Sequence, residues 1–255
     1  MTPLLKRYLA EVKSESRHCI NQQKDIITEA DIAHLPAPVQ EYFHVCRYVG
    51  REKKMCAHIE WKEMWIKMSP KQKWITLQGM QFNGVTAPSR IVYMRAKVAG
   101  FYALEARDKF QEGHGNMLIK LLRYFTMTDA KGPEMDVSAL VTVLSESLLV
   151  PAYALQPYIK WTQVNDRAAA ATLTHKGLTV NGVFHFNDKG EAIRFETDDR
   201  YQSGKHGSFK KLKWFATISE YIEKDGRLIP STVSAAWQEG PEIFEYYKGK
   251  IDNIT

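Results

Sequence analysis

The residues of this chain that could do chemistry are a few charged side chains set among apolar ones. Asp108 lies in FYALEARDKF, where alternate positions are apolar, with Arg107 beside it and Arg95 on the preceding strand candidate. Glu134 and Asp136 stand at a predicted helix start. A charge on a buried face is tolerated only when it is paired. These residues therefore predict either an ion-pair network that ties a helix to a sheet or a polar patch that orients a ligand inside an apolar cavity.

No motif of a common enzyme or metal site is present. The chain contains no G-x-S-x-G elbow, no H-E-x-x-H pair and no phosphate-loop glycine spacing. The cysteines Cys19, Cys46 and Cys56 are odd in number and lack C-x-x-C spacing. We therefore expect reduced thiols, with neither a disulfide framework nor a metal site, and we predict no cofactor.

Basic and aromatic residues are interleaved in KHGSFKKLKWF, residues 205–215, as on surfaces that bind single-stranded nucleic acid. The formal charge of +6 and the pI near 9.0 are modest, and acidic residues are nearly as numerous as basic ones. One such cluster favours a solvated loop that leads into a strand, so we expect no nucleic-acid partner.

Length and composition are those of a folded globular protein, with 44% apolar and 25% charged residues in 255. We predict a single domain over residues 1–255, with a helical segment over 1–52 and a β-rich body over 53–255 that contains a helical insertion at about 133–156. Lys, Arg and Glu interrupt the apolar residues of the N-terminus, which predicts neither a secretory leader nor a transmembrane segment. We expect a cytoplasmic protein, and the sequence leaves the oligomeric state open.

Two amphipathic helices are predicted in the N-terminal segment. Apolar residues recur at helical spacing over the first dozen or so residues. A second helix is predicted over Pro38–Arg47, within LPAPVQEYFHVCRYVG, because Pro38 suits a first helical turn and Gly50 a terminator.

A third helix is predicted over Val137–Leu148, where apolar residues recur one and two turns apart. Asp136 or Ser138 would cap the start of this helix, and Pro151 would close it. Glu134 would then be no more than a carboxylate matched to the helix dipole.

The remaining chain has the composition of antiparallel strands and tight turns. About five strands fit between Met55 and residue 125, and the segment Ala168–Phe195 has the pattern strand, turn, strand, turn, strand. Asp225-Gly226 is a hairpin turn signal. The final strand candidates are Leu212–Glu223, Arg227–Gln238 and Ile243–Ile254.

The order of these elements predicts an α+β fold with a large curved antiparallel sheet, half-open like a barrel, and a few helices packed on its apolar face. A sheet of this size is wider than one helix can shield. We therefore expect helix Val137–Leu148 to cover most of the apolar face and to leave a smaller part uncovered as a pocket.

Several segments, taken in their order and spacing, carry a resemblance to a known family. They are LPAPVQEYF (Leu35–Phe43), Met94–Leu122, GPEMD (Gly132–Asp136), LSESLLVPAYAL (Leu144–Leu155), GVFHFNDKG (Gly182–Gly190), DDRY (Asp198–Tyr201) and GRLIPSTVSAAW (Gly226–Trp237). From Leu35 onward the chain resembles an uncharacterised bacterial family of unknown function. The resemblance implies matching positions at Arg95, Arg107, Asp108, Gly132, Glu134, Glu146, Pro151 and Arg200.

The predicted architecture is also similar to bacterial lipoprotein-carrier half barrels, which hold acyl chains between sheet and helices. This is a likeness of fold, and fold does not fix function.

Three hypotheses for function follow. The first is a non-enzymatic protein that binds a hydrophobic or lipid-like small ligand between sheet and helices, and we favour it. The second is a hydrolase-like or isomerase-like enzyme with a carboxylate as general base and an arginine as anion contact. The third is an interaction module with a filled core. The ligand-pocket candidates are Arg95, Arg107, Asp108, Glu134, Glu146 and Arg200, and Asp108 is expected to pair with Arg95, Arg107 or Arg200.

Overall fold

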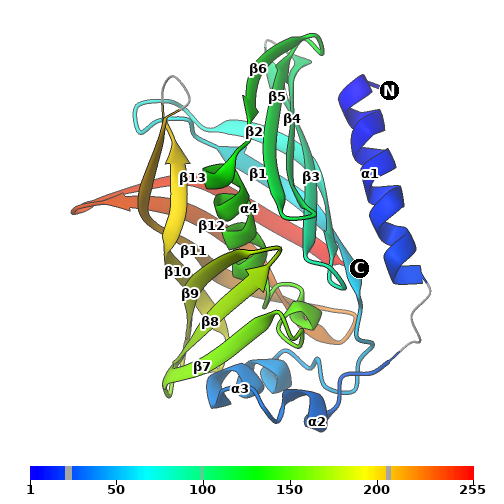
Figure 1. Cartoon of the computed structure of the whole chain (residues 1–255), viewed down its shortest axis with the longest axis vertical. Coiled ribbons are helices and arrows are strands. Elements are labelled where there is room, and N and C mark those ends of the chain that lie inside the picture. Colours follow the sequence, from blue (N-terminus) through cyan, green and yellow to red (C-terminus); the bar gives the residue numbers. More distant parts are fainter. Residues whose placement is uncertain (21–24, 99, 205–207) are drawn as a thin grey trace.

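A single antiparallel sheet of 13 strands forms the body of the protein (Figure 1). The computed structural model describes residues 1–20, 25–98, 100–204 and 208–255. The strands follow the order β6-β5-β4-β3-β2-β1-β13-β12-β11-β10-β9-β8-β7 across the sheet. They are β1 (Cys56–Ile66), β2 (Ile75–Gly84), β3 (Ser89–Val98), β4 (Phe101–Gln111), β5 (His114–Leu121), β6 (Phe125–Ala130), β7 (Ile159–Asn165), β8 (Ala168–His175), β9 (Leu178–Phe186), β10 (Ala192–Ser203), β11 (Phe209–Lys224), β12 (Arg227–Glu239) and β13 (Glu242–Ile254).

The sheet consists of two meanders, β1–β6 and β7–β13, in which consecutive strands are neighbours. The meanders join where β1 pairs with β13, the first strand with the last. Strands β6 and β7, which are consecutive in the chain, therefore lie at opposite edges of the sheet. The segment that connects them has to cross from one edge to the other.

Helix α4 (Pro133–Ser145) makes this crossing on the concave side of the sheet (Figure 1). It packs against β10, β5 and β9, and to a smaller extent against β4 and β8. Leu140, Val141, Val143 and Leu144 are fully buried in the main core. The predicted third helix therefore exists and lies on the apolar face of the sheet, as expected.

The start of α4 differs from the prediction. The helix begins at Pro133 and follows Gly132, whose φ of 111° lies in the region that favours glycine, and no side chain caps it. Asp136 and Ser138 lie within the helix, so neither is its cap. Asp136 instead accepts a hydrogen bond from the backbone N–H of Gly115, with N and Oδ1 2.7 Å apart, and so anchors the first turn to β5.

The end of α4 also differs from the prediction. The helix ends at Ser145, and Pro151 begins a separate 3-10 helix, η1 (Pro151–Tyr153). Leu148 lies after the helix but is still buried, so its assignment to the core is correct although its assignment to the helix is wrong.

Helix α1 (Pro3–Ile20) is longer than the predicted dozen residues and packs against β2, β3 and β4, away from α4 (Figure 1). A second apolar cluster lies under it, with Leu4 and Tyr8 of the helix against Phe82, Ile91 and Tyr93 of the sheet. Helices α1 and α4 contact opposite sides of β4. Successive side chains of β4 therefore point alternately toward the cluster under α1 and toward the concave side that holds α4.

Two further helices pack at one end of the sheet. Helix α2 (Glu29–Ile32) was not expected from the sequence, although the Thr28 side chain caps it. Helix α3 (Ala37–Val45) confirms the helix predicted over Pro38–Arg47, although it begins one residue earlier and ends two residues earlier, and Val39, Tyr42 and Phe43 are fully buried. The Tyr42 hydroxyl donates a hydrogen bond to the Leu148 carbonyl, with the oxygens 2.8 Å apart, which ties α3 to the segment after α4.

The large curved antiparallel half barrel is as predicted, but its class is more β-rich than α+β because long strands make up most of the chain. The strand candidates in the last third of the sequence are confirmed as β11, β12 and β13, and Asp225 and Gly226 adopt the positive φ values of a tight hairpin turn. None of the described helices combines the length and hydropathy of a membrane span.

The cysteines differ in state. Cys46 is a buried free thiol, and burial raises the pKa of this thiol to about 12. Cys56 is disulfide-bonded, so the expectation of reduced thiols throughout is wrong at this position. The side chain of Cys19 lies outside the described residues.

We expect Leu144→Ala to lower the free energy of unfolding by about 2–5 kcal/mol, because it removes fully buried methyl groups and leaves a cavity between α4 and the sheet. Leu9→Ala on α1 is the matched control, because Leu9 is 40% exposed. Urea unfolding followed by tryptophan fluorescence measures both changes. Equal effects of the two variants would show that α4 does not hold the core together.

Candidate ligand-binding pocket

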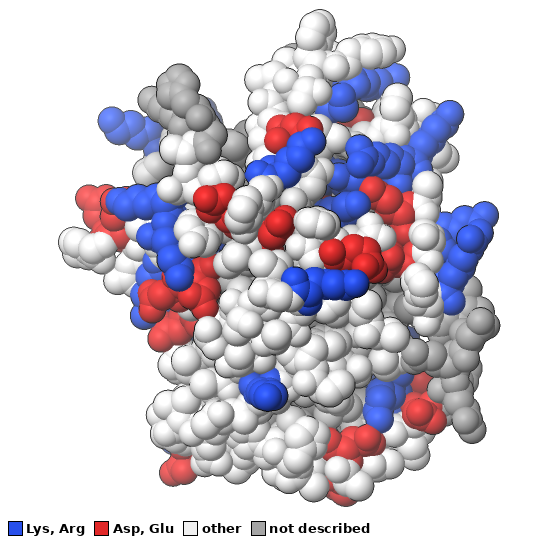
Figure 2. All heavy atoms as spheres, viewed as in Figure 1, with Lys and Arg blue, Asp and Glu red and all other residues white. Residues whose placement is uncertain are grey.

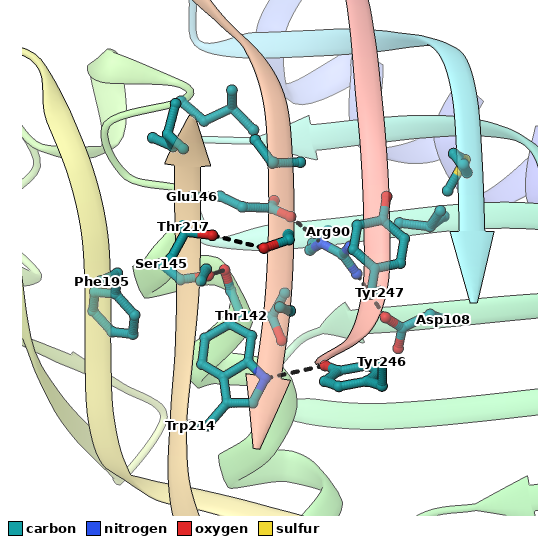
Figure 3. Close-up of a pocket in the computed structure, with 18 of the residues that line it drawn as sticks. Arg90, Asp108, Thr142, Ser145, Glu146, Phe195, Trp214, Thr217, Tyr246 and Tyr247 are labelled. Atoms are coloured by element: carbon teal, nitrogen blue, oxygen red, sulfur yellow. Dashed lines mark hydrogen bonds and ion pairs between the residues drawn. The ribbon is translucent and has the colours of Figure 1, made fainter. Parts of the chain in front are cut away.

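A cavity of about 210 Å³ lies between α4 and the concave face of the sheet (Figure 3). Its sheet wall comes mainly from β1, β3, β10, β11, β12 and β13, with one residue each from β4, β5 and β9, and much of this wall is apolar. Trp61, Met94, Phe195, Trp214 and Ile218 are among the residues that line it. A cavity of this size and lining can hold a small apolar group.

The side of α4 that faces the cavity is polar. Thr142 and Ser145, three positions apart on one face of α4, line the cavity together with Glu146, the residue that follows the helix (Figure 3). Leu140 and Leu144 lie on the face that packs into the core. The cavity therefore has a largely apolar wall on the sheet and a polar wall on the helix.

Arg90 on β3 joins two carboxylates at one end of the cavity (Figure 3). Its Nη1 atom lies 2.7 Å from Oδ2 of Asp108 on β4, and its Nε atom lies 2.8 Å from Oε1 of Glu146. Burial would lower the pKa of Arg90, but the Glu146 and Asp108 charges outweigh burial and raise this pKa above its ordinary value. The guanidinium thus stays charged and holds α4 to the sheet.

Two buried amides complete the contacts of Glu146. Gln81 Nε2 and Asn83 Nδ2, both on β2, donate hydrogen bonds to Glu146 Oε2 at 2.9 Å and 2.8 Å. Gln81 and Asn83 are themselves almost fully buried. Each Glu146 oxygen therefore has a donor, as a buried carboxylate requires.

The prediction that Asp108 pairs with an arginine is confirmed, but the proposed partners are wrong. Asp108 stands opposite Val92 in the β3–β4 register, so Arg90, two residues before Val92, is its diagonal neighbour on the same face. Arg107 directly precedes Asp108 and lies on the opposite face of β4, and Arg95 stands opposite Glu105. The sequence does contain a signal for Arg90: it stands two residues before Val92, so the alternation of β3 places it on the same face as Val92 and Met94.

Of the other five residues predicted to line a pocket, two line the cavity and three lie elsewhere. Arg200 and Glu146 line the cavity, whereas Arg95, Arg107 and Glu134 do not. Arg107 is fully buried against α1, where it forms an ion pair with Glu11. Glu134 lies in the first turn of α4.

Arg95 hydrogen-bonds to Gln78 through Nε, 3.2 Å from Oε1, and Nη2, 2.9 Å from Oε1. Its guanidinium carbon also lies 4.0 Å from the centre of the Tyr102 ring. These contacts occupy Arg95 outside the cavity.

Sequence reasoning missed several residues of the cavity, among them Arg90, Thr142, Ser145, Trp214 and Tyr246. Trp214 belongs to the basic and aromatic segment at residues 205–215, of which 205–207 lie outside the described part of the chain. Its ring is buried, and its Nε1 atom donates to the Tyr246 hydroxyl at 3.1 Å (Figure 3). Strands far apart in the sequence bring these residues together, so no local pattern could indicate the cluster.

Fold and site together define a curved-sheet protein with one helix in its concavity and a cavity beneath that helix. The chain belongs to a family of unknown function, DUF6544, whose model matches residues 25–249. This finding confirms the resemblance to an uncharacterised family. Comparison with curated proteins gives no match.

The chain has a distant likeness to three solved structures. A putative outer membrane lipoprotein-sorting protein domain from Vibrio parahaemolyticus is 9% identical, with a TM-score of 0.41 over 78% of this chain and 84% of that one. A LolA superfamily protein from Nitrosomonas europaea is 7% identical, with a TM-score of 0.43 over 85% and 92%. A DUF1329 family protein from Desulfovibrio piger is 11% identical, with a TM-score of 0.40 over 87% and 92%. Likenesses at this level carry no argument about function.

We expect Arg90→Met to lower the free energy of unfolding by about 3–5 kcal/mol, because it leaves the Asp108 and Glu146 carboxylates without their shared partner. Arg95→Met, on the same strand but outside the cavity, should cost less than about 1 kcal/mol. Urea unfolding curves of the two variants check this. Similar losses in both would mean that Arg90 does not hold the carboxylates in solution.

Proposed function

We propose that this protein binds a hydrophobic or lipid-like small ligand in the cavity between α4 and the concave face of the sheet. The observation that carries the proposal is the cavity itself, whose wall is largely apolar on the sheet and polar along α4. Sites for small molecules commonly combine a mainly apolar lining with a few placed polar groups. The apolar part of a ligand would lie against the sheet, and its polar part would lie near α4.

The enzyme alternative has less support from the geometry. The two carboxylates of the cavity, Asp108 and Glu146, are both held by Arg90, and Glu146 also receives hydrogen bonds from Gln81 and Asn83. These contacts explain the carboxylates as parts of a structural network. The third hypothesis, an interaction module with a filled core, has still less support, because the interior contains a cavity.

The test is binding of the apolar fluorescent probe N-phenyl-1-naphthylamine. We expect saturable binding to the wild-type protein and binding at least about tenfold weaker in Ala216→Phe, because the added ring fills the cavity that Ala216 lines. Ser219→Phe, at an exposed position of the same strand outside the cavity, should bind like the wild type.

Circular dichroism should be the same for all three proteins, which separates loss of the cavity from loss of the fold. No saturable binding to the wild type, or equal binding to Ala216→Phe, would refute the proposed cavity function.

A further inference from the structure

Arg200 is the arginine of the cavity that lacks a carboxylate partner among the described residues. Three arginines line the cavity. Arg90 pairs with both of its carboxylates, and Arg194 pairs with Glu196, with Nη2 and Oε2 3.3 Å apart. No ion pair of Arg200 with a described carboxylate is formed, although Arg200 borders the same apolar space.

The contacts of Arg200 use one part of its guanidinium group. Nη1 donates to the Ser138 carbonyl, 3.2 Å away, and to the Thr142 hydroxyl. The flat face stacks on Trp214, with the guanidinium carbon 4.3 Å from the ring centre, and lies 5.7 Å from the centre of Trp237. Nε is buried and has no hydrogen-bond partner among the described atoms. The edge formed by Nε and Nη2 therefore makes no hydrogen bond with the described residues, while Nη1 and the stacking hold the guanidinium in place.

We propose that this edge of Arg200 binds the acidic head group of an amphipathic ligand whose apolar part occupies the cavity. The inference rests on the proposed function and adds the chemical class of the ligand. Two parallel N–H groups on a guanidinium edge match the two oxygens of a carboxylate. The attraction is strengthened because the surroundings are largely apolar, and an acidic head group would supply the counter-charge that Arg200 lacks.

Displacement of N-phenyl-1-naphthylamine by decanoate and by decanol tests this proposal, because the two competitors share a chain and differ in the head group. In the wild type, decanoate should displace the probe at a concentration at least about tenfold lower than decanol. Arg200→Gln should abolish this preference, which is the ratio of the two displacement concentrations and is measured within each variant, and Arg200→Lys should retain part of it. Lys213→Gln is the control, because Lys213 is a cation on β11 that does not line the cavity.

The outcomes separate the two proposals. Equal displacement by decanoate and decanol in the wild type, or an unchanged preference in Arg200→Gln, would overturn the acidic-ligand inference and leave the apolar cavity function standing. A wild-type protein that binds no probe would overturn both. Decyl phosphate, used as a third competitor, tells whether a phosphate head group is preferred to a carboxylate.

A second feature stands apart from the cavity, at the end of the sheet where β3 turns into β4 and β5 into β6. Phe101, Leu122, Tyr124, Phe125 and Met127 are all exposed there, by 44% to 78%. The strand ends beside these turns carry Arg95 and Lys97 on β3 and Lys120 on β5, Arg123 lies in the second turn, and no acidic residue occurs in residues 95–104 or 118–128. We call these nine residues the basic rim. In Figure 2 the uppermost tip of the molecule is uncharged, and Lys and Arg side chains lie beside it.

Two further observations bear on the basic rim. Leu122 and Arg123 adopt positive φ values of 51° and 70°, where asparagine and glycine are the usual residues, so turn geometry does not explain why they stand there. The turn after β1, residues 67–74, lies at the same end of the sheet and again has three lysines, an exposed methionine and no acid.

We infer that the basic rim docks on an anionic lipid surface. Exposed aromatic and aliphatic side chains can enter the interfacial layer of a bilayer, and Lys and Arg around them are attracted to acidic head groups. The charge of the rim is of one sign, which complements such a surface and would disfavour contact between two copies of the rim. This inference rests on the exposed turns alone and does not depend on the cavity.

Co-sedimentation with vesicles of phosphatidylglycerol and phosphatidylcholine tests the docking. The wild type should bind these vesicles, bind vesicles of phosphatidylcholine alone much more weakly, and be released by salt. Lys120→Glu combined with Arg123→Glu, and separately Tyr124→Ser combined with Phe125→Ser, should each reduce binding at least about tenfold. The control pair is Lys160→Glu and Val164→Ser on β7, an exposed site at the opposite edge of the sheet.

Sedimentation of the protein without lipid is run in parallel. Failure to bind acidic vesicles, or equal loss of binding in the β7 control, would overturn the docking inference. Self-association that the rim variants abolish, without vesicle binding, would instead identify the rim as a contact between copies of this chain.

Discussion

The structure depends on one topological constraint: the strands β6 and β7 follow each other in the chain but lie at opposite edges of the sheet. The segment between them must cross the concave face, and α4 is the part of it that does so. A helix of 13 residues is about 20 Å long, whereas thirteen strands at about 4.8 Å spacing would span nearly 60 Å if the sheet were flat. One helix can therefore cover the concave face only because the sheet curves around it, and part of that face stays open as the cavity.

The crossing also explains the buried charges. Where α4 ends, Glu146 meets β2 and β3, and the sheet supplies Arg90, Gln81 and Asn83 to satisfy it. A buried ion pair adds little net stability over an apolar replacement, but its geometry is specific. Here the pair of Arg90 with Glu146 fixes where the end of the helix lies against the first meander, and Asp108 holds Arg90 from the neighbouring strand. At the other side of the same helix, Arg200 and Ser138 join it to β10 of the second meander.

These two attachments leave the cavity between them, and they differ in a way that bears on function. The attachment through Arg90 satisfies both of its carboxylates, so it is complete as a structural element. The attachment through Arg200 uses one nitrogen of the guanidinium and leaves Nε buried without a hydrogen-bond partner in the described part of the chain. Most buried hydrogen-bond donors in folded proteins have a partner, so a donor without one calls for an explanation. One side of the apolar cavity therefore has a polar network whose charges are paired, and the other side has an arginine that is not paired with a described carboxylate.

Local patterns in the sequence determined the elements. Alternation of apolar residues indicated the strands, the spacing around Leu140 and Leu144 indicated α4, and Asp225-Gly226 indicated a hairpin. The carboxylate of Asp108 on an apolar strand face also indicated a buried pair, since an unpaired charge there would be too costly. Each of these signals depends on residues close together in the chain, so each can be read without the fold.

Only the tertiary structure decided which residues meet. Arg107 was as good a partner for Asp108 by composition as Arg90, but the pleat sends adjacent side chains to opposite faces, and the register of β3 on β4 selected Arg90. The helix limits depended on tertiary contacts too, because Asp136 and Ser138 bond to the sheet and do not cap α4. The cavity was likewise decided at this level, since β1, β10 and β13 approach one another only when the first strand pairs with the last. The sequence by itself indicated most strands, the three longer helices and the need for a buried pair, whereas register and sheet closure, which depend on distant residues, determined the site.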